Sequence, residues 1–416
     1  MAQLSDDCFA FGGPMLSVDS AIDLIIARAQ PVGAYERVSL FDADGRVLGE
    51  DVAAGFPLPP FANSAVDGYA VRFSDLVPDQ PTSLPVLGRI EAGAGALALA
   101  AGAAARVFTG AVMPEGADTV FMQEDVILQD NIVVLPAGLK RGANMRPAGE
   151  DVQSGEIGLH KGARLRPQDV ALAAALGAST LNVAQRLRVG VFSTGNELAT
   201  PGGQRSGTQI YDSNRFMLLA MLRRLGCAPH DLGVLRDDPD HLADALKVAA
   251  GEHDLLLTSG GVSTGEADYV KSALEQIGSL TFWRMAIKPG RPVAMGVIDG
   301  TPFVGLPGNP VASFVTFAYV VRPLALALMG ADVARFQPLP VRAAFTYKKK
   351  AGRREFVRAS LTLGADGVLE AQKFPREGAG LLSSLTQSDG FVELREHITR
   401  VEPGQSVGFL SFASLD

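Results

Sequence analysis

The sequence predicts a multidomain protein of the class α/β plus β. Residues 187–330 alternate apolar strands with amphipathic helices, which is typical of a parallel sheet covered by helices on both faces. Residues 338–416 contain short alternating runs, which are typical of a small β-barrel or β-sandwich. The first 186 residues mix helical segments with short strand candidates.

The central region has the clearest secondary-structure pattern. We expect its apolar runs to form strands at 187–194, 230–235, 253–259 and 279–285. The segments with helical spacing lie at 212–226, 239–251 and 268–278. The apolar stretch 311–321 stops at Arg322 and Pro323, so we expect a buried helix that is too short to span a bilayer.

The N-terminal region is harder to assign. Segments 17–29 and 166–177 have helical spacing, and the first has a serine near its start. The Ala- and Gly-rich stretch 92–107 resembles low complexity, and we expect a tolerant surface excursion there. Short strand candidates lie at 119–128 and 131–136.

Composition limits the classes of function. The 416 residues carry a net charge of -8, and this acidic balance gives no indication of nucleic-acid binding. Cys8 and Cys227 are too few and too far apart for a disulfide framework or a zinc cluster. The first residues lack a basic segment followed by an apolar run, so we expect no signal peptide. These features predict a soluble, cytoplasmic protein with no nucleic-acid or membrane partner.

Acidic side chains follow the carboxyl ends of three predicted strands: Glu197, Asp237 and Asp268. Because ligands of open α/β sheets bind beyond the carboxyl ends of the strands, we expect these carboxylates to converge on one rim. Carboxylates are poor phosphate ligands unless a hard cation lies between, and Mg²⁺ is commonly held by one or two carboxylates plus substrate phosphates. The alternative is that each acid caps a helix or lies in its first turn.

The segment TSGGVSTGEAD at 258–268 is a candidate phosphate loop. Its small residues let backbone N–H groups approach an anion at the start of a helix. It lacks the lysine of a P-loop and the spacing of a dinucleotide fingerprint, so an ordinary strand-to-helix turn is the alternative. The small residues concerned are Ser259, Gly260, Gly261, Ser263 and Gly265.

Two further turns carry cations or prolines. Arg284, Lys288 and Arg291 surround a Pro-Gly turn, where they either hold an oxyanion or belong to a solvated loop. Pro307 and Pro310 bracket a rigid turn that leads into a helix.

Two turns of the N-terminal region carry acids. Asp67 lies in NSAVDGYAV, and Asp151 lies in RPAGED beside Arg146 and Glu150. The alternative for either motif is ordinary turn chemistry. The five histidines lie in unrelated contexts, so no Ser/His/Asp set is indicated.

Seven segments occur in one order: FANSAVDGYAV, FTGAVMPEGADTVFMQED, NMRPAGED, STGNEL, TSGGVSTGEADYV, FWRMAIKPGRP and GLPGNPVA. On these motifs the chain, over about residues 14–400, resembles the MoeA/gephyrin E-domain family, the molybdopterin molybdenumtransferases of molybdenum cofactor synthesis. The resemblance implies a MogA-like doubly wound parallel-sheet domain, an elongated discontinuous N-terminal domain with a β-rich insertion, and a C-terminal β-barrel. It also implies a homodimer with a composite active site. The implied domains are 14–52 with 148–186, 53–147, 187–332 and 337–416.

The implied reaction takes adenylylated molybdopterin and molybdate, splits the phosphoanhydride, releases AMP and leaves molybdenum on the dithiolene sulfurs. Mg²⁺ is the implied cofactor, and molybdate is a substrate. The implied protein partners are the molybdopterin-adenylylating protein and the enzymes that accept the cofactor. One alternative is molybdopterin adenylylation by the same type of sheet domain, against which the long N-terminal region and the barrel argue. The other is a gephyrin-like scaffold, against which the intact set of acids argues.

The resemblance further implies roles for individual residues. The implied catalytic residues are Asp67, Thr109, Asp151, Glu197, Asp237, Asp268 and Lys288. Among these, the implied metal ligands are Glu197, Asp237 and Asp268. The implied substrate contacts are Ser259, Gly260, Gly261, Ser263, Gly265, Arg284, Pro307, Pro310, Arg353 and Arg358. Arg284 stands where many members have lysine, and the two barrel arginines lie in or just after the segment GRREF.

Overall fold

The computed structural model describes residues 15–235, 239–261, 269–290 and 292–415, and the chain divides into two compact units. The first unit contains Met1–Gly49, Gly162–Leu165 and Leu181–Asp416. The second contains Glu50–Lys161 and Arg166–Thr180. The second unit is therefore an insertion into the sequence of the first.

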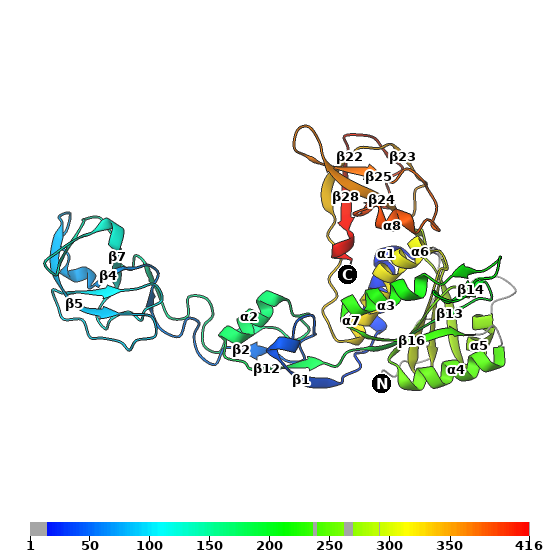
Figure 1. The fold of residues 1–416 in the computed structure, drawn as a ribbon, viewed down its shortest axis with the longest axis horizontal. Helices are drawn as coiled ribbons and strands as arrows, with labels where there is room; N and C mark the ends of the chain where they lie inside the picture. Colours follow the sequence, from blue (N-terminus) through cyan, green and yellow to red (C-terminus); the bar gives the residue numbers. More distant parts are fainter. Residues whose placement is uncertain (1–14, 236–238, 262–268, 291, 416) are drawn as a thin grey trace. The chain divides into compact units, whose positions relative to one another are not determined.

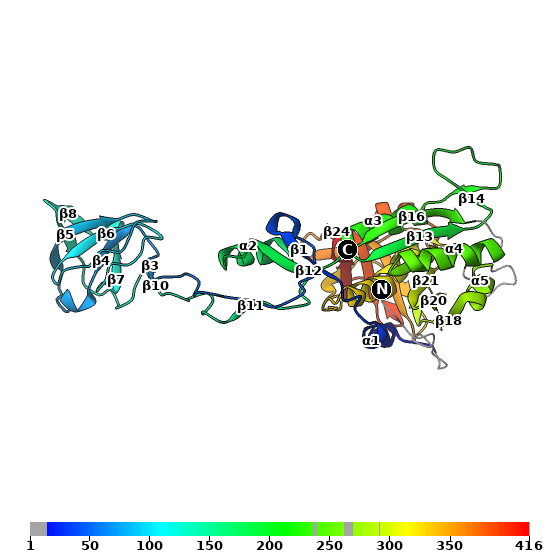
Figure 2. The same cartoon turned by 90° about the horizontal axis from the view of Figure 1, so that it is seen from below.

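A six-stranded sheet forms the centre of the first unit, in the order β16-β13-β17-β21-β20-β18 (Figure 1). In Figure 2 the labels of β16, β13, β21, β20 and β18 follow one another in this succession. The strands are β13 (Arg188–Thr194), β16 (Ala228–Leu235), β17 (Leu255–Ser259), β18 (Gly278–Arg284), β20 (Pro292–Ile298) and β21 (Thr301–Leu306). The predicted strands of the central region are thus confirmed.

The sheet is mixed rather than purely parallel. β16, β13, β17 and β21 pair in parallel, whereas β20 runs antiparallel to both β21 and β18. The turn between β20 and β21 explains this departure from the predicted pattern. It consists of Asp299 and Gly300, which both have positive φ, at 47° and 83°. A two-residue turn of this kind joins only antiparallel neighbours.

Helices cover both faces of the sheet. Val189 and Val191 of β13 pack in the same cluster as the apolar residues of α1, α3, α6 and α7, whereas Phe192 packs with α4 and α5. This alternation is the period-2 pattern of a strand buried on both faces. The helices are α1 (Val18–Arg28), α3 (Asn214–Leu225), α4 (Pro239–Glu252), α5 (Tyr269–Ile277), α6 (Pro310–Thr316) and α7 (Arg322–Leu328).

The apolar helix after β21 is longer than the sequence predicted. α6, a π-helical turn at Phe317–Val321 and α7 form one helix over Pro310–Leu328. Within the described residues it is the one helix long and apolar enough to cross a membrane, but 89% of its apolar window is buried inside the protein. The prediction of burial is confirmed, and the predicted end at Pro323 is wrong. The π-helical turn changes the hydrogen-bond pattern just before Pro323, which then lies in the first turn of α7.

The C-terminal region forms a closed barrel. β24 pairs with both β25 and β26, which closes the ring β24-β25-β22-β28-β26. A further short strand, β19 (Ile287–Lys288), follows β18 in sequence and pairs in parallel with β24. Of the two predicted architectures the structure has the barrel. Its strands are β22 (Leu339–Ala343), β24 (Arg354–Leu363), β25 (Leu369–Lys373), β26 (Gly390–Leu394) and β28 (Ser406–Ser411).

The second unit contains a six-stranded sheet in the order β7-β4-β6-β5-β9-β8. The expected surface excursion at 92–107 is wrong for its last part, because Ala104–Val107 form β6 inside this sheet. Ala104 and Ala105 are fully buried, so a run of small residues serves here as a tightly packed strand. The other strands are β4 (Gly68–Val71), β5 (Thr82–Ile90), β7 (Thr119–Met122), β8 (Ile127–Gln129) and β9 (Ile132–Leu135).

The remaining elements of the second unit are shorter. Helix α2 (Pro167–Ala175) contributes Leu172 to a small apolar cluster with Ala54 and Val152. The short pairs are β2 (Val52–Ala53) with β11 (Ile157–Leu159), and β3 (Asn63–Ser64) with β10 (Met145–Arg146).

In the first unit, Arg354 joins helix α1 to the barrel. The residue is 4% exposed, and its guanidinium donates to Asp19 at 2.6 and 3.2 Å, to Glu393 at 3.0 Å and to Glu396 at 3.2 Å. The hydrogen bond from Arg354 lowers the pKa of Asp19 below its ordinary value of 3.8. This contribution to stability is therefore present above pH 3.8 and is lost as the pH falls through the lower pKa of the folded state.

We predict that Arg354→Met lowers the free energy of unfolding by about 3–5 kcal/mol, because it leaves the buried carboxylate of Glu393 without its counter-charge. Arg335 is a matched control, since it also pairs with Asp19, at 3.2 Å, but its side chain is 43% exposed. Arg335→Met should lower the free energy of unfolding by less than about 1 kcal/mol. Urea denaturation measures both variants, and equal losses would contradict the prediction.

Candidate functional site

A cavity of about 210 Å³, here called the sheet cavity, lies at the carboxyl ends of β13 and β17. The structure brings four of the predicted site residues to it: Glu197, Ser259, Gly260 and Pro310. Its other lining residues include Thr194, Asn214, Gly308, Gly380 and Leu382. The predicted residues Asp237, Ser263, Gly265, Asp268 and Arg291 lie outside the described residues.

The glycine pair after β17 is required by the backbone itself. Gly260 and Gly261 have positive φ, at 87° and 67°. A Cβ atom on Gly261 would lie 2.0 Å from Oγ1 of Thr194. Neither position therefore accepts a side chain readily, and the main chain can approach a ligand closely here.

Asn214 ties two loops of the sheet cavity together. It is the first residue of α3, and its Nδ2 donates to Oγ of Ser259 at 2.8 Å and to the carbonyl of Gly308 at 2.7 Å. The hydroxyl of Ser313 donates to the carbonyl of Pro307 at 2.9 Å. Sequence analysis missed Asn214, because a polar residue at the start of a helix is also typical of ordinary capping.

The sheet cavity has part of what a magnesium site needs. Glu197 is exposed at the cavity, and its carboxylate is the kind of oxygen ligand that Mg²⁺ takes together with substrate phosphates. Among the residues that the structure describes, no group of three His, Cys, Asp or Glu side chains could hold a metal. Since Asp237 and Asp268 lie outside those residues, the three-acid site stays a prediction.

A second cavity, of about 190 Å³, lies where β19 meets the barrel and is here called the cationic cavity. Two of the predicted residues, Lys288 and Arg358, line it. The remaining basic side chains at its wall are Lys373 and Arg376. Arg284 is exposed at the end of β18 and lines neither cavity.

A buried carboxylate organises the cationic cavity. Glu355 is 1% exposed and accepts hydrogen bonds from Lys288 at 3.2 Å, Arg353 at 2.6 Å and the Tyr347 hydroxyl at 2.8 Å. Burial raises the pKa of Glu355, but the hydrogen bonds from Tyr347, Arg353 and Lys288 outweigh it, so this pKa lies below the ordinary 4.5. Glu355 is therefore an anion at neutral pH. Its contribution to stability is lost only as the pH falls below 4.5, through the lower pKa of the folded state.

Arg358 is held differently from Lys288. Its Nη2 donates to the carbonyls of Arg376 and Gly378, both at 3.2 Å, and its Nε is buried without a partner among the described residues. Burial lowers its pKa, yet guanidinium groups stay protonated in proteins. The described residues give Arg358 no ion pair, so it adds a positive charge to the cavity that no carboxylate neutralises directly.

One short segment of chain borders both cavities. Gly378 and Ala379 line the cationic cavity, and Gly380 and Leu382 line the sheet cavity. The backbone N–H of Val311, in α6, donates to the carbonyl of Ala379 at 3.0 Å. The two cavities are therefore neighbours within the first unit.

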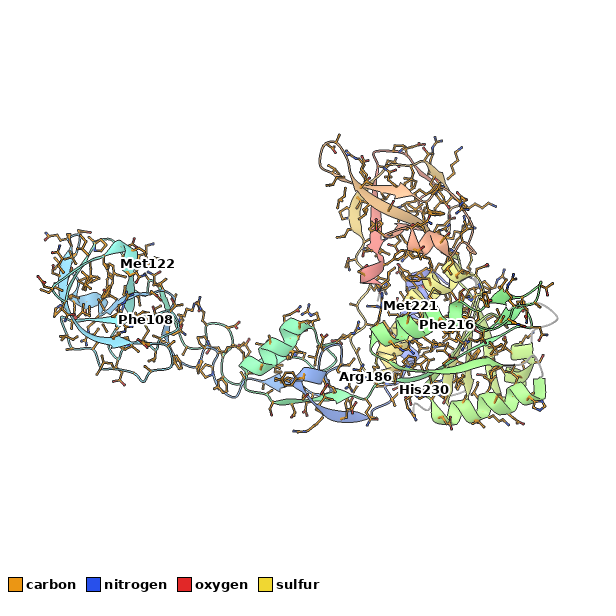
Figure 3. All side chains as sticks on the ribbon, in the orientation of Figure 1. Phe108, Met122, Arg186, Phe216, Met221 and His230 are labelled. Carbon is orange, nitrogen blue, oxygen red and sulfur yellow. The ribbon has the colours of Figure 1, made fainter. Side chains whose placement is uncertain are left out.

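The remaining predicted residues belong to the second unit. The backbone N–H and the hydroxyl of Thr109 both donate to Oδ1 of Asp67 at 2.8 Å, and these bonds lower the pKa of Asp67. The ring centroid of Phe108, which is labelled in Figure 3, lies 4.7 Å from the guanidinium carbon of Arg89 and 4.9 Å from that of Arg106. Asp67 and Thr109, from two segments 42 residues apart, thus form a hydrogen-bonded pair, and the positive charge of Arg106 also lowers the pKa of Asp67.

Asp151 lies in another part of the second unit. Its side chain is exposed, and its N–H donates to the carbonyl of Leu58 at 2.9 Å. The strand at the start of its motif, β10, pairs with β3, the strand before Asp67. The two acidic motifs are therefore linked through one short pair of strands.

Three family models match the chain in succession. They are described as the MoeA N-terminal region (domain I and II) over residues 16–177, a probable molybdopterin binding domain over 190–327, and the MoeA C-terminal region (domain IV) over 340–412. The chain is 38% identical to a molybdopterin molybdenumtransferase of Haemophilus influenzae, over 96% of this chain and 100% of that protein. It is 37% identical to one of Synechococcus elongatus, over 90% and 94%. A crystal structure of a molybdopterin biosynthesis MoeA protein from Pyrococcus horikoshii matches with a TM-score of 0.80 at 30% identity, covering 96% of this chain and 100% of that one.

Proposed function

This chain belongs to the MoeA family, and on that basis we propose that it is a molybdopterin molybdenumtransferase. The reaction consumes adenylylated molybdopterin and molybdate and releases AMP, and molybdenum remains on the dithiolene sulfurs. The observation that carries the proposal is the pair of neighbouring cavities. One has a carboxylate and a glycine turn at the end of a sheet, and the other is basic, as a reaction between a nucleotide-linked substrate and an oxyanion requires.

We propose that the sheet cavity holds the adenylylated pterin. The turn at Gly260 and Gly261 brings main-chain groups close to the substrate, and the network around Asn214 fixes that turn against the Pro307–Gly308 turn. Glu197, with Asp237 and Asp268, would hold Mg²⁺, which supplies charge neutralisation at the phosphoanhydride when bound.

We propose that the cationic cavity holds molybdate. Lys288 and Arg358 supply positive charge, and Arg353 shares with Lys288 the anion of Glu355. Molybdate is doubly negative, so a site of fixed cations stabilises it. Glu355 keeps Lys288 in place and offsets part of its charge.

We further propose a homodimer in the cytoplasm, with the domain division given by the family resemblance. The second unit carries Asp67, Thr109 and Asp151, and in the proposed dimer it completes the sheet cavity of the other subunit. The molybdopterin-adenylylating protein and the enzymes that accept the cofactor are the proposed protein partners.

Turnover tests the proposed function directly. Purified protein mixed with adenylylated molybdopterin, molybdate and Mg²⁺ should release AMP and form the molybdenum cofactor. Omission of molybdate should stop cofactor formation, and chelation of Mg²⁺ should slow cleavage of the phosphoanhydride. If ATP and molybdopterin were instead joined into the adenylylated compound, the adenylyltransferase reading would replace this one. Absence of any turnover would favour a scaffold.

Lys288→Ala should raise the molybdate concentration needed for half-maximal turnover by about ten- to a hundredfold, because a charge-assisted contact contributes about 1.5–3 kcal/mol. The adenylylated pterin should bind with nearly unchanged affinity. Lys350→Ala, which removes an exposed lysine that does not line the cationic cavity, is the control and should leave both constants unchanged. A variant that lost pterin binding but kept its molybdate response would show that the wrong anion is assigned to this cavity.

Mixed dimers test the composite site. Asp67→Ala and Asp268→Ala subunits should each be inactive alone, and a heterodimer of the two should recover part of the activity because one of its sites is wild type. Purification with two different tags isolates the heterodimer. Lack of recovery in that species would place both residues in the site of a single chain.

A further inference from the structure

Asp67 and Thr109 lie beyond the ends of two neighbouring strands of the second unit. Asp67 directly precedes β4, and Thr109 follows β6 by two residues. The two strands are antiparallel, and their last pair at this end is Gly68 with Val107. The hydrogen bonds between the strands therefore stop just before the two site residues, whose relative position depends on further contacts.

The side chain of Arg106 supplies contacts on both sides of this pair. Its Nη1 donates to the carbonyl of Gly68, the residue after Asp67, in a long hydrogen bond of 3.5 Å. Its guanidinium carbon lies 4.9 Å from the ring centroid of Phe108, the residue before Thr109. A guanidinium over an aromatic face is attracted to it by about 0.5–1 kcal/mol at an exposed site. Arg106 therefore links the two segments that carry Asp67 and Thr109.

A third segment joins the same arrangement through Gln123. Its backbone N–H donates to the carbonyl of Asp67 at 3.0 Å, and its side-chain oxygen accepts from Nη2 of Arg106. The guanidinium carbon of Arg106 also lies 5.1 Å from the ring centroid of Tyr69, a residue that is 6% exposed. Among the described residues, Arg106 donates to the side chain of neither Asp67 nor Thr109. It acts on them only through their neighbours and through its charge.

The carboxylate of Asp67 keeps one oxygen for a substrate. The N–H and the hydroxyl of Thr109 both donate to Oδ1, whereas Oδ2 accepts no hydrogen bond from the described residues. Rotation of the carboxyl group would break both bonds to Thr109, so these bonds give Oδ2 one direction. That direction stays fixed only while the two segments keep their relative position, and reacting groups lose much of their effect when they are misplaced by about 1 Å.

The alternative role of Arg106 is to bind an anionic group of the substrate. Its partners are a main-chain carbonyl and a neutral amide, and no ion pair involves it among the described residues. However, the charge of Arg106 already acts on the carboxylate of Asp67, whose pKa it lowers. An anion bound at Arg106 would be repelled by that carboxylate, whereas a positioning role meets no such repulsion.

We propose that Arg106 is a positioning residue, which holds the segments of Asp67 and Thr109 together so that the carboxylate of Asp67 has one orientation in the active site. This inference rests on the proposed function, because it takes Asp67 as a residue of the reaction. It predicts that loss of Arg106 slows turnover without weakening the binding of either substrate.

Arg106→Met is the central variant, and the chain offers a matched control in Arg89→Met. The guanidinium carbon of Arg89 lies 4.7 Å from the ring centroid of the same Phe108. Its side chain is 64% exposed and pairs with Glu91 at 2.8 Å. Arg89→Met therefore also removes a cation from the Phe108 ring, but it leaves the links of Arg106 intact. Neither variant should lower the melting temperature by more than a few degrees, because both residues lie at the surface of the unit.

Steady-state AMP release with adenylylated molybdopterin, molybdate and Mg²⁺ measures both variants. Arg106→Met should lower kcat by about ten- to a hundredfold with KM unchanged for both substrates, whereas Arg89→Met should leave kcat and KM unchanged. Arg106→Lys should give an intermediate kcat, because an ammonium keeps the charge but lacks the planar fork of a guanidinium. Equal kcat values for Arg106→Met and Arg89→Met would overturn the inference. A raised KM at unchanged kcat would also overturn it and would assign anion binding to Arg106.

A double-mutant cycle separates positioning from a general structural role. In a protein that carries Asp67→Asn, Arg106→Met should cause little further loss of the remaining turnover, because the orientation of the Asp67 carboxylate no longer matters. Losses that multiply fully would show that Arg106 acts independently of Asp67 and would overturn the inference. A wild-type protein without any turnover would instead refute the proposed function.

Discussion

The pairing of β19 with β24 is the constraint on which the cationic cavity and the attachment of the barrel to the central sheet depend. It aligns Ile287 with Arg354 and Lys288 with Glu355. Since neighbouring side chains of a strand point to opposite sides, Arg354 meets Asp19 and Glu393 while Glu355 meets Lys288. One short strand pair therefore places two ion networks at once. A slip of one residue would exchange their sides.

Charge balance in the cationic cavity follows from that pairing. Lys288 and Arg353 share the anion of Glu355, whereas Arg358 rests on main-chain carbonyls. A cavity with every cation free would hold a dianion so tightly that its release would be slow. In the proposed function, partial neutralisation by Glu355 leaves enough positive charge to bind molybdate while keeping that binding reversible.

Much of the fold could be predicted because its signals are local. The apolar runs predicted four of the six strands of the central sheet but not β20 and β21, the alternating runs predicted the strands of the barrel, and the resemblance in motifs gave the family. The errors had non-local causes. The direction of β20 depends on the turn at Asp299, the continuation past Pro323 depends on a π-helical turn, and the burial of β6 depends on strands far away in sequence.

The residues of the candidate site likewise divide into those that local motifs could predict and those that depend on contacts between distant segments. Motifs indicated Glu197, Ser259 and Lys288. The structure adds what motifs cannot give, namely which of their atoms already have hydrogen-bond partners within the protein. The hydroxyl of Ser259 accepts from Asn214 and is 5% exposed, so it belongs to the frame of the cavity. Oδ1 of Asn214, by contrast, has no hydrogen-bond partner among the described residues, and an unsatisfied buried acceptor favours a group that brings a donor over one that brings another acceptor.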